Sequence, residues 1–322
     1  MSSTDIKRAL VIGASGQVGA VLLERLENSG VTTRGTFCHH GSAVQKQKPS
    51  SSKLELVKPG QQPLLVQLDL LDREQISDVI ADFAPDCIYL AGAFTDVDGC
   101  ELEPERSNAI NVQGVRDVVT AARELSSCRL VYFSSDFVFD GLRGPYDEKA
   151  KPSPACVYGK HKVEAERVVA SSGLSNVIIR TSTVFGRDPQ SKNFIARLLA
   201  SLQKGESVVV PDDQIANPTY NETLADAAIE LCNSYNQGLF NVAGATRVSR
   251  YQLALDAAAI FALPTKLISA SSTLALKQAA KRPLIGGLVI NRAKSALKTE
   301  LIGHVAGLQK LKAVLAQESL VV

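Results

Sequence analysis

Between residues 9 and 182 the chain alternates short apolar, β-branched runs with longer helical patterns, and this alternation constrains its fold more than any other feature. The first run, ALVIGA at 9–14, is uniformly apolar, as in a strand buried on both faces of a parallel sheet. Further strands are predicted at 31–37, 64–70, 86–92, 129–135 and 176–182. The chain is therefore predicted to be an α/β protein with a doubly wound parallel sheet of the Rossmann type.

The alternation breaks in two places. Residues 41–63 are rich in Ser, Gln, Lys and Pro, which is typical of a surface insertion. Beyond residue 182 the pattern loosens into three helical segments and one strand segment, at 194–205, 221–235, 249–263 and 238–244. We therefore predict a first domain over 1-181 and a smaller, mixed C-terminal domain over 182-322, partly interleaved with the first.

Composition excludes several classes of protein. The 35 basic and 33 acidic residues leave a net charge of +2, which gives little support to nucleic-acid binding. No apolar run approaches the roughly 18 residues of a membrane span, and the first residues lack a signal-peptide cleavage site. We therefore expect a cytoplasmic protein with no membrane partner. The six cysteines and four histidines show no paired spacing, so no metal site is expected.

A glycine-rich loop, GASGQVG at 13–19, stands directly between the first predicted strand and the first predicted helix. Glycines permit a tight turn there, and the free N–H groups of the helix N-terminus can meet a pyrophosphate. This placement predicts a dinucleotide site, and the alternative is a plain glycine-rich turn. The cofactor-binding candidates in the loop are Gly13, Ser15, Gly16, Gln17 and Val18.

The end of the second strand should distinguish NADP from NAD. No Asp or Glu lies between Glu27 and Glu55, whereas Arg34 and His39 are placed near the strand end. A basic residue there accommodates the 2′-phosphate, so NADP(H) is the predicted cofactor. Asp69, followed by Leu70, ends the third strand and could accept a hydrogen bond from the adenine amine. The alternative for Asp69 is a helix cap.

Tyr158 and Lys162 form a YxxxK sequence at the start of a predicted helix. Residues four apart share a helix face, which places the ammonium beside the phenol and should lower the tyrosine pKa from about 10 toward neutrality. Ser134 and Ser135 end the predicted strand upstream, at the edge where open α/β sheets bind ligands. Serine, tyrosine and lysine together predict a proton relay beside a nicotinamide.

These blocks resemble the extended short-chain dehydrogenase/reductase superfamily over nearly the whole chain, and more narrowly its dTDP-4-dehydrorhamnose reductase branch. The similarity is carried by residues 13–19, 91–114, 134–141, 144–166, 180–186, 213–219 and 282–283. It implies that Ser135, Tyr158 and Lys162 are catalytic and that Tyr158 protonates a sugar ketone as NADPH delivers hydride. It further implies that Lys162 binds the nicotinamide ribose and that the cofactor touches Ala91, Gly92 and Ala93.

The substrate implied by this resemblance is a nucleotide-linked sugar, whose diphosphate requires cationic donors. Arg282, in the shared block RP, and Arg187, after the block RTSTVFG, are the candidates, although either could be a solvated surface residue. The sugar is expected to meet Thr95, Ser135 and Asn217. The chain departs from the branch at Phe137, Thr183 and Ala20-Val21, where tyrosine, tryptophan and an acidic metal ligand are usual. The missing acidic residue argues against a metal requirement, whereas the changes at Phe137 and Thr183 leave the cofactor chemistry intact and concern the identity of the sugar.

Three functions remain open from the sequence. The first is an NADPH-dependent reductase of the 4-keto group of a nucleotide-linked deoxy sugar. The second is a dinucleotide-binding regulatory subunit, because the chain is also similar to the beta subunit of methionine adenosyltransferase and shares its SSD motif at 134–136. The third is a nucleotide-sugar epimerase or dehydratase, which Asp136 alone supports poorly. A homodimer or a complex with a partner enzyme is possible under each.

Overall fold

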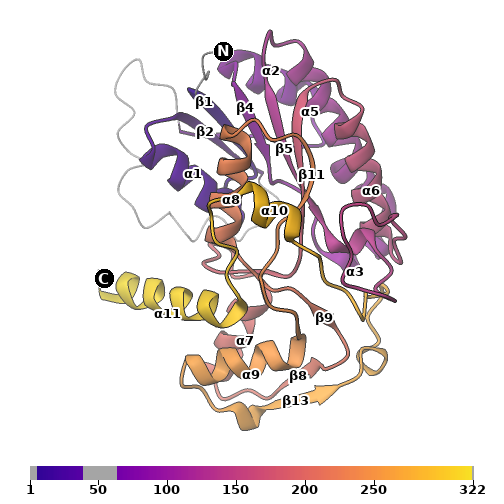
Figure 1. The fold of residues 1–322 in the computed structure, drawn as a ribbon, viewed down its shortest axis with the longest axis vertical. Coiled ribbons are helices and arrows are strands. Elements are labelled where there is room, and N and C mark those ends of the chain that lie inside the picture. Colours follow the sequence, from indigo (N-terminus) through magenta and orange to yellow (C-terminus); the bar gives the residue numbers. More distant parts are fainter. Residues whose placement is uncertain (1–5, 39–63, 321–322) are drawn as a thin grey trace.

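A computed structural model describes residues 6–38 and 64–320. The predicted insertion over 41–63 and the candidate His39 lie outside these residues. Within them, Figure 1 shows a central sheet covered by helices on both faces, with a smaller group of helices and strands below it. No helix in the described part of the chain is long and apolar enough to cross a membrane.

The central sheet has seven strands in the order β11-β6-β5-β4-β1-β2-β3, and all of its pairings are parallel. From β6 to β3 this is the strand order of a Rossmann fold, so the predicted fold class is confirmed. The strands are β1 (Arg8–Ile12), β2 (Thr32–Phe37), β3 (Leu65–Gln67), β4 (Cys87–Leu90), β5 (Arg129–Ser135), β6 (Ser175–Thr181) and β11 (Gly238–Asn241).

Strand β11 comes from the C-terminal third of the chain but completes the central sheet. It pairs with β6, with Gly238 opposite Val177 and Asn241 opposite Arg180. The sequence predicts this strand and assigns it to the second domain. Its apolar residues Leu239 and Phe240 indicate a strand, whereas the strand with which it pairs lies far away in the sequence. The residues after 182 therefore contribute one strand to the central sheet and also form the smaller group of helices and strands.

Two separate apolar cores cover the two faces of the sheet. One is closed by α1 (Gly19–Asn28), α8 (Asn221–Asn233) and α10 (Asn291–Ala296). The other is closed by α2 (Arg73–Phe83), α5 (Gly114–Arg123) and α6 (Val157–Ala170). Strands with both faces buried must be apolar throughout, which explains the continuous runs in the sequence.

Short elements connect β4 to α5 and follow β5. The first connection contains α3 (Val97–Leu102), α4 (Pro104–Asn108) and a π-helix, η3 (Ala109–Gln113). A 3₁₀ turn, η4 (Asp136–Val138), begins directly after β5. Both connections leave the carboxyl ends of their strands, the edge at which ligands bind in open α/β sheets.

The remaining elements form a third core beyond that edge. Its helices are α7 (Phe194–Gln203), α9 (Arg250–Ile260) and α11 (His304–Leu320). The small strands pair as β7 (Val184–Phe185) with β10 (Thr219–Tyr220), β9 (Ile215–Ala216) with β12 (Val248–Ser249), and β8 (Val208–Pro211) with β13 (Ile268–Ser271). Two 3₁₀ turns, η5 (Thr265–Leu267) and η6 (Leu274–Leu276), flank β13.

Candidate active site

The glycine loop turns sharply between β1 and α1 and touches the end of β4. Gly13 has φ +88°, and a Cβ there would lie 2.5 Å from the backbone nitrogen of Gly92. A Cβ on Gly19 would lie 2.2 Å from the carbonyl oxygen of Gly13. No side chain caps the N-terminus of α1, so its N–H groups can bind an anion. The loop therefore has the close packing and the free donors that a dinucleotide diphosphate needs.

The segment Ala91-Gly92-Ala93 continues from β4 directly beside this loop, as the cofactor assignment requires. The backbone nitrogens of Ala91 and Gly92 both donate to the Ile12 carbonyl, at 3.0 and 2.8 Å. Asn111, in the π-helix η3, then holds Phe94 by accepting from its nitrogen and donating to its oxygen, both at 2.9 Å. Sequence reasoning missed Asn111, because nothing in the local pattern marks the extra residue of a π-helix.

The C-terminal part of the chain reaches the glycine loop through polar contacts. Asn221, fully buried at the start of α8, donates to the Gln17 carbonyl at 2.8 Å, and Gln190 donates to the Ser15 carbonyl at 3.0 Å. Arg187 forms ion pairs with Glu24 on α1 and Glu318 on α11. The structure therefore places Arg187 against α1 and leaves it outside the pocket described below.

Arg34 does not lie at the end of β2, contrary to the sequence argument. It is the third residue of the strand, is 3% exposed, and donates to Asp82 on α2 at 2.7 Å. Its guanidinium also stacks on the Phe83 ring, 4.6 Å from the centroid. The strand runs on to Phe37, so the side chain points into the layer between sheet and α2. Arg34 is thus a buried structural cation and does not reach a 2′-phosphate.

Asp69 lies where the ends of β2 and β3 meet. Burial and the neighbouring Asp69 carboxylate together raise the pKa of Cys38, the residue after β2, to about 11. The helix cap that sequence offered as the alternative for Asp69 belongs to Asp72, which accepts from Gln75 at the start of α2. Asp69 and the buried Leu70 therefore stand at the ligand edge of the sheet.

The two serines that end β5 point to opposite sides. Ser134 is buried and donates to Glu166 at 2.6 Å. Ser135 donates to Asp136 at 3.3 Å and hydrogen-bonds Tyr158, lowering the pKa of that phenol. The alternation of a strand therefore selects Ser135 as the serine that faces the site.

Tyr158 lies on the buried face of α6, with its ring edge-on to Phe137. The sequence predicts a lowered pKa for this phenol, but burial is the largest effect and raises its pKa well above 10, with only partial opposition from the bond to Ser135. Without bound ligands, Tyr158 is thus a neutral phenol. A neutral phenol can donate a proton, which suits the reduction of a carbonyl.

Lys162 follows Tyr158 by one turn of α6 and is 4% exposed. Its ammonium donates to the Phe133 carbonyl at 2.9 Å and lies 5.8 Å from the centroid of the Tyr158 ring. Burial lowers the pKa of Lys162 to about 8, although the carboxylate of Glu166 opposes this shift. The ammonium is therefore held close enough to stabilise a phenolate at position 158.

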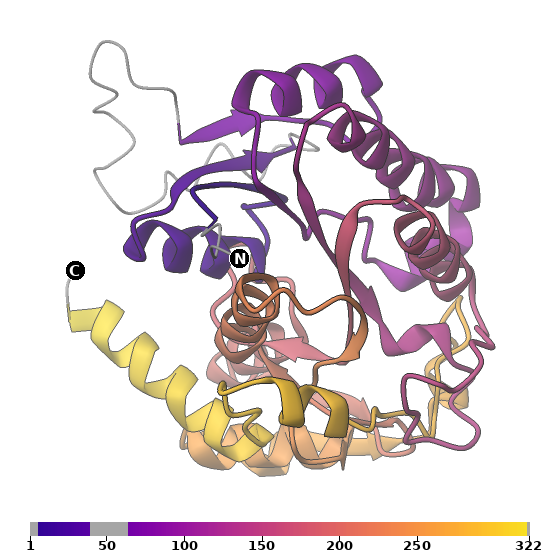
Figure 2. The ribbon, with the colours of Figure 1, turned by 45° about the horizontal axis from the view of Figure 1, so that its top comes forward.

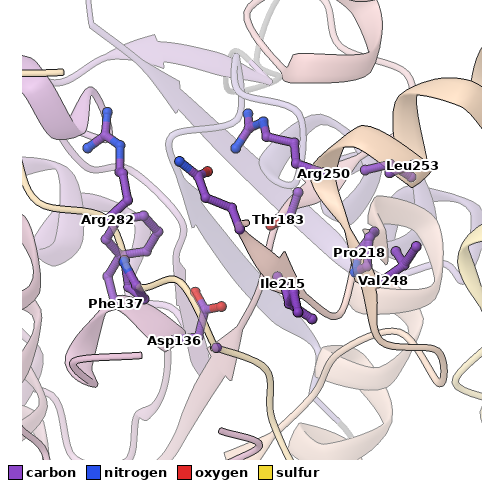
Figure 3. Close-up of a pocket in the computed structure, with 13 residues that line it drawn as sticks. Asp136, Phe137, Thr183, Ile215, Pro218, Val248, Arg250, Leu253 and Arg282 are labelled. Carbon is purple, nitrogen blue, oxygen red and sulfur yellow. The ribbon is translucent and has the colours of Figure 1, made fainter. Parts of the chain in front are cut away.

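A pocket opens beside Ser135, between the sheet and the third core. Asp136 and Phe137 form one wall, whereas Ile215, Pro218, Val248 and α9 form the other. Figure 3 shows the guanidinium groups of Arg282 and Arg250 on the same side of this pocket. No acidic side chain pairs with Arg250 in the described part of the chain; its guanidinium stacks on Phe194 at 4.3 Å from the ring centroid. Burial and the nearby cations Arg197 and Arg282 lower the pKa of Arg250 to about 10.

Arg282 is positioned by α3 and retains bonding capacity. One of its terminal nitrogens donates to Asp98 at 2.7 Å, while Nη1 is buried with no hydrogen-bond partner in the structure. Arg282 therefore lines this pocket, and Arg250 is a second cation there that sequence reasoning missed. Two guanidinium groups that line one pocket can bind the oxygens of a diphosphate.

The two predicted contacts to the sugar differ in their surroundings. Asn217 is 5% exposed and uses its amide to hold the backbone, donating to Gly244 at 2.8 Å and accepting from Leu288 at 2.9 Å. These bonds make Asn217 a brace of the pocket wall rather than a free donor for a sugar. Thr95 is exposed after β4, just before α3. Among the described residues, no group of three acidic, His or Cys side chains could hold a metal ion.

Comparison with known proteins gives one consistent family. The family described as "RmlD substrate binding domain" matches residues 7–316. A dTDP-4-dehydrorhamnose reductase of Aggregatibacter actinomycetemcomitans is 32% identical, over 71% of this chain and 81% of that protein. The methionine adenosyltransferase 2 subunit beta of Danio rerio is 26% identical, over 87% and 82%. A crystal structure of dTDP-4-dehydrorhamnose reductase from Bacillus anthracis in complex with NADP superimposes with a TM-score of 0.81 at 25% identity, covering 96% and 99%.

Proposed function

Because the chain belongs to the RmlD substrate binding domain family, we propose that it is an NADPH-dependent reductase of the 4-keto group of a nucleotide-linked deoxy sugar. The observation that carries this proposal is the meeting of Ser135, Tyr158 and Lys162 beside a pocket that is lined by two arginines. The residues before 182 would mainly bind the dinucleotide, and those after 182 would mainly bind the nucleotide sugar.

The residues of the glycine loop and of the β4 end fit a dinucleotide. Side chains at Gly13 or Gly19 would fill the space where backbone and diphosphate must come close, and the start of α1 offers uncapped N–H donors. The Bacillus anthracis reductase was crystallised with NADP. NADPH supplies the hydride when it is bound. Preference for the phosphorylated form rests on the absence of acidic residues between Glu27 and Glu55.

Each residue of the relay has a separate task in this proposal. The phenol of Tyr158 donates its proton to the carbonyl oxygen of the sugar, and the Ser135 hydroxyl hydrogen-bonds the same oxygen. The Lys162 ammonium stabilises the phenolate that remains and holds the nicotinamide ribose. Phe137 and the wall braced by Asn217 exclude water from this oxygen.

Arg282 and Arg250 would bind the diphosphate of the substrate. A guanidinium matches phosphate oxygens through paired N–H donors, and both arginines line the pocket. Thr95 stands at the edge where the sugar would enter. The assay that tests the proposal follows absorbance at 340 nm as NADPH meets a panel of nucleotide 4-keto sugars, with Tyr158→Phe as the control. Absence of turnover on every member, with NADPH bound, would overturn it.

A second candidate is a regulatory subunit of a methionine adenosyltransferase. It is favoured by the 26% identity to the Danio rerio subunit, which extends over 87% of this chain. Under this alternative the chain binds NADP(H) without turnover and co-purifies with a methionine adenosyltransferase from the same organism. Turnover by the isolated chain favours the reductase. We further propose, from the sequence, that the chain is cytoplasmic and that it could form a homodimer. Both candidate functions are compatible with this.

A further inference from the structure

Glu166 is a buried carboxylate that the proposed reaction does not use directly. It follows Lys162 by one turn of α6, as Lys162 follows Tyr158, so the three side chains share the buried face of this helix. Its two oxygens accept from Arg180 on β6, at 2.8 and 2.6 Å, and from Ser134 on β5 at 2.6 Å. Contacts from α6, β6 and β5 thus fix the position of this carboxylate, one helical turn after Lys162.

Arg180 is as deeply buried as its partner. It is 3% exposed, stacks on the Phe139 ring at 5.0 Å from the centroid, and has one terminal nitrogen, Nη1, with no hydrogen-bond partner in the structure. Lys162, Glu166 and Arg180 therefore place two positive charges and one negative charge in the core when all are ionised. The carboxylate pairs directly with Arg180 and attracts the Lys162 ammonium without pairing with it, and burial leaves both interactions poorly screened by water.

The other titratable groups around Lys162 contribute little negative charge to balance its ammonium. They are Tyr158 on α6, Tyr132 on β5, Cys100 on α3 and Asp136 on η4. Burial raises the pKa of the Tyr132 phenol and of the Cys100 thiol, so both stay neutral. Asp136 accepts hydrogen bonds from Ser135 and Ser182. Glu166 is thus the main counter-charge of Lys162.

We propose that Glu166 and Arg180 are opposed positioning residues for Lys162: Glu166 keeps the lysine charged, and Arg180 limits how strongly it does so. The inference rests on the proposed reductase function for its catalytic meaning, because Lys162 must be an ammonium to stabilise the phenolate of Tyr158. If Glu166 and Arg180 served only to hold α6 against β6, replacing either residue would lower stability. The two replacements would then not shift the pH midpoint of Lys162 in opposite directions.

The two residues make predictions of opposite sign. Glu166→Gln removes the attraction and leaves the Arg180 cation unbalanced, so the pH midpoint of Lys162 falls by roughly one unit or more. Arg180→Met leaves Glu166 facing Lys162 alone, so the midpoint rises. The double variant Glu166→Gln/Arg180→Met removes both buried charges, keeps the core neutral, and returns the midpoint to between those of the single variants. It also provides a folded protein if Glu166→Gln alone does not fold.

The midpoint is measurable without any substrate. An NMR titration of the Lys162 side-chain ¹³Cε chemical shift over pH 6 to 11, in protein carrying ¹³C-labelled lysine, gives this midpoint for the ligand-free chain, and it does not require a reagent to reach the buried amine. Glu164→Gln is the matched control, because Glu164 lies on the exposed side of the same helix and pairs with Arg116. This control keeps the wild-type midpoint. Where the chain is active, the alkaline limb of kcat/KM shifts with the midpoint of each variant.

The result that supports the proposal is a lower midpoint in Glu166→Gln and a higher one in Arg180→Met, with Glu164→Gln unchanged. Equal midpoints in wild type and both variants, or shifts in the same direction, would overturn it. Failure of the reductase assay leaves the NMR titration valid, so a wrong function and a wrong role for Glu166 are distinguished. Thermal unfolding of each variant separates loss of fold from loss of charge control.

Discussion

The rings of Phe137 and Tyr158 meet edge to face, with 5.7 Å between their centroids and 77° between their planes. Such a contact orients the tyrosine ring without using its hydroxyl group. The ring is also held by the buried face of α6, on which Lys162 lies one turn away. Removing the hydroxyl alone should therefore leave the geometry of the site intact.

Tyr158→Phe is expected to lower kcat by about 100- to 10,000-fold, the usual contribution of a positioned proton donor. NADPH affinity, measured by the fluorescence of the bound nucleotide, stays near the wild-type value. Lys162→Ala is the contrasting variant, because it should weaken NADPH binding as well as the rate. Most of the turnover number surviving in Tyr158→Phe would show that another group donates the proton.

Arg282→Ala and Arg250→Ala are each expected to raise KM for a nucleotide sugar, with little change in kcat or in NADPH binding. A charged hydrogen bond to phosphate contributes about 1.5–3 kcal/mol, which corresponds to roughly a 10- to 100-fold change. Arg123→Ala, exposed on α5 away from the pocket, is the control for loss of a cation. Wild-type kinetics in both pocket variants would place the diphosphate elsewhere.

Arg34→Ala is expected to act on stability rather than on cofactor choice. The variant loses the bond to Asp82 and the stacking on Phe83, and its free energy of unfolding falls by about 1–3 kcal/mol. Urea unfolding measures this loss, and titrations with NADPH and NADH should weaken equally or not at all. A loss of affinity for NADPH but not for NADH would instead show that Arg34 binds the 2′-phosphate.

Asp136→Asn is expected to stabilise the protein at neutral pH. Burial raises the pKa of Asp136 from 3.8 to about 6, although Ser182 and Ser135 donate to its carboxylate. The acid form is thus favoured in the folded state, so its stabilisation is complete below pH 4 and is lost as the pH rises through 6. The variant avoids this loss and gains up to about 3 kcal/mol over wild type at pH 7.

Urea unfolding at pH 4 and pH 7 measures this difference, which should vanish at the lower pH. Asp140→Asn is a control of opposite sign. Slight burial raises the pKa of Asp140, but bonds from Leu142, Tyr146 and Ser153 outweigh it and lower the pKa overall. That variant is therefore less stable than wild type at pH 7. Equal stability of Asp136→Asn and wild type at both pH values would contradict the buried-acid assignment.

Local patterns were sufficient to predict the sheet and the shared helix face of Tyr158 and Lys162, because each depends on neighbours in the chain. Strands buried on both faces have to be apolar, and Tyr158 and Lys162 share a helix face by spacing alone. Contacts between residues that are distant in the sequence could not be predicted from these local patterns. Arg34 is held by an acid on α2, Arg250 reaches the pocket only when α9 packs beyond β5, and Asn217 is used up by two backbone groups.

The ionisation of Tyr158 shows a second limit. A neighbouring ammonium suggests a lowered pKa, but burial, which sequence spacing does not reveal, has the larger effect and reverses the direction. The same holds for Asp136, whose raised pKa depends on how completely β6 and the pocket wall enclose it. The pKa of each group in the site depends on the residues that surround it, and most of those residues come from segments distant in the sequence.

The late position of β11 in the chain has a consequence during synthesis. β6 ends at Thr181 and β11 begins at Gly238, so β6 leaves the ribosome well before the strand that covers its outer edge. Until residues 238–241 emerge, an apolar strand with unpaired backbone groups is open to other chains. We therefore expect a nascent chain stalled after β6 has emerged from the ribosome but before β11 has emerged to aggregate or bind chaperones, and one stalled after β11 has emerged to be released from them.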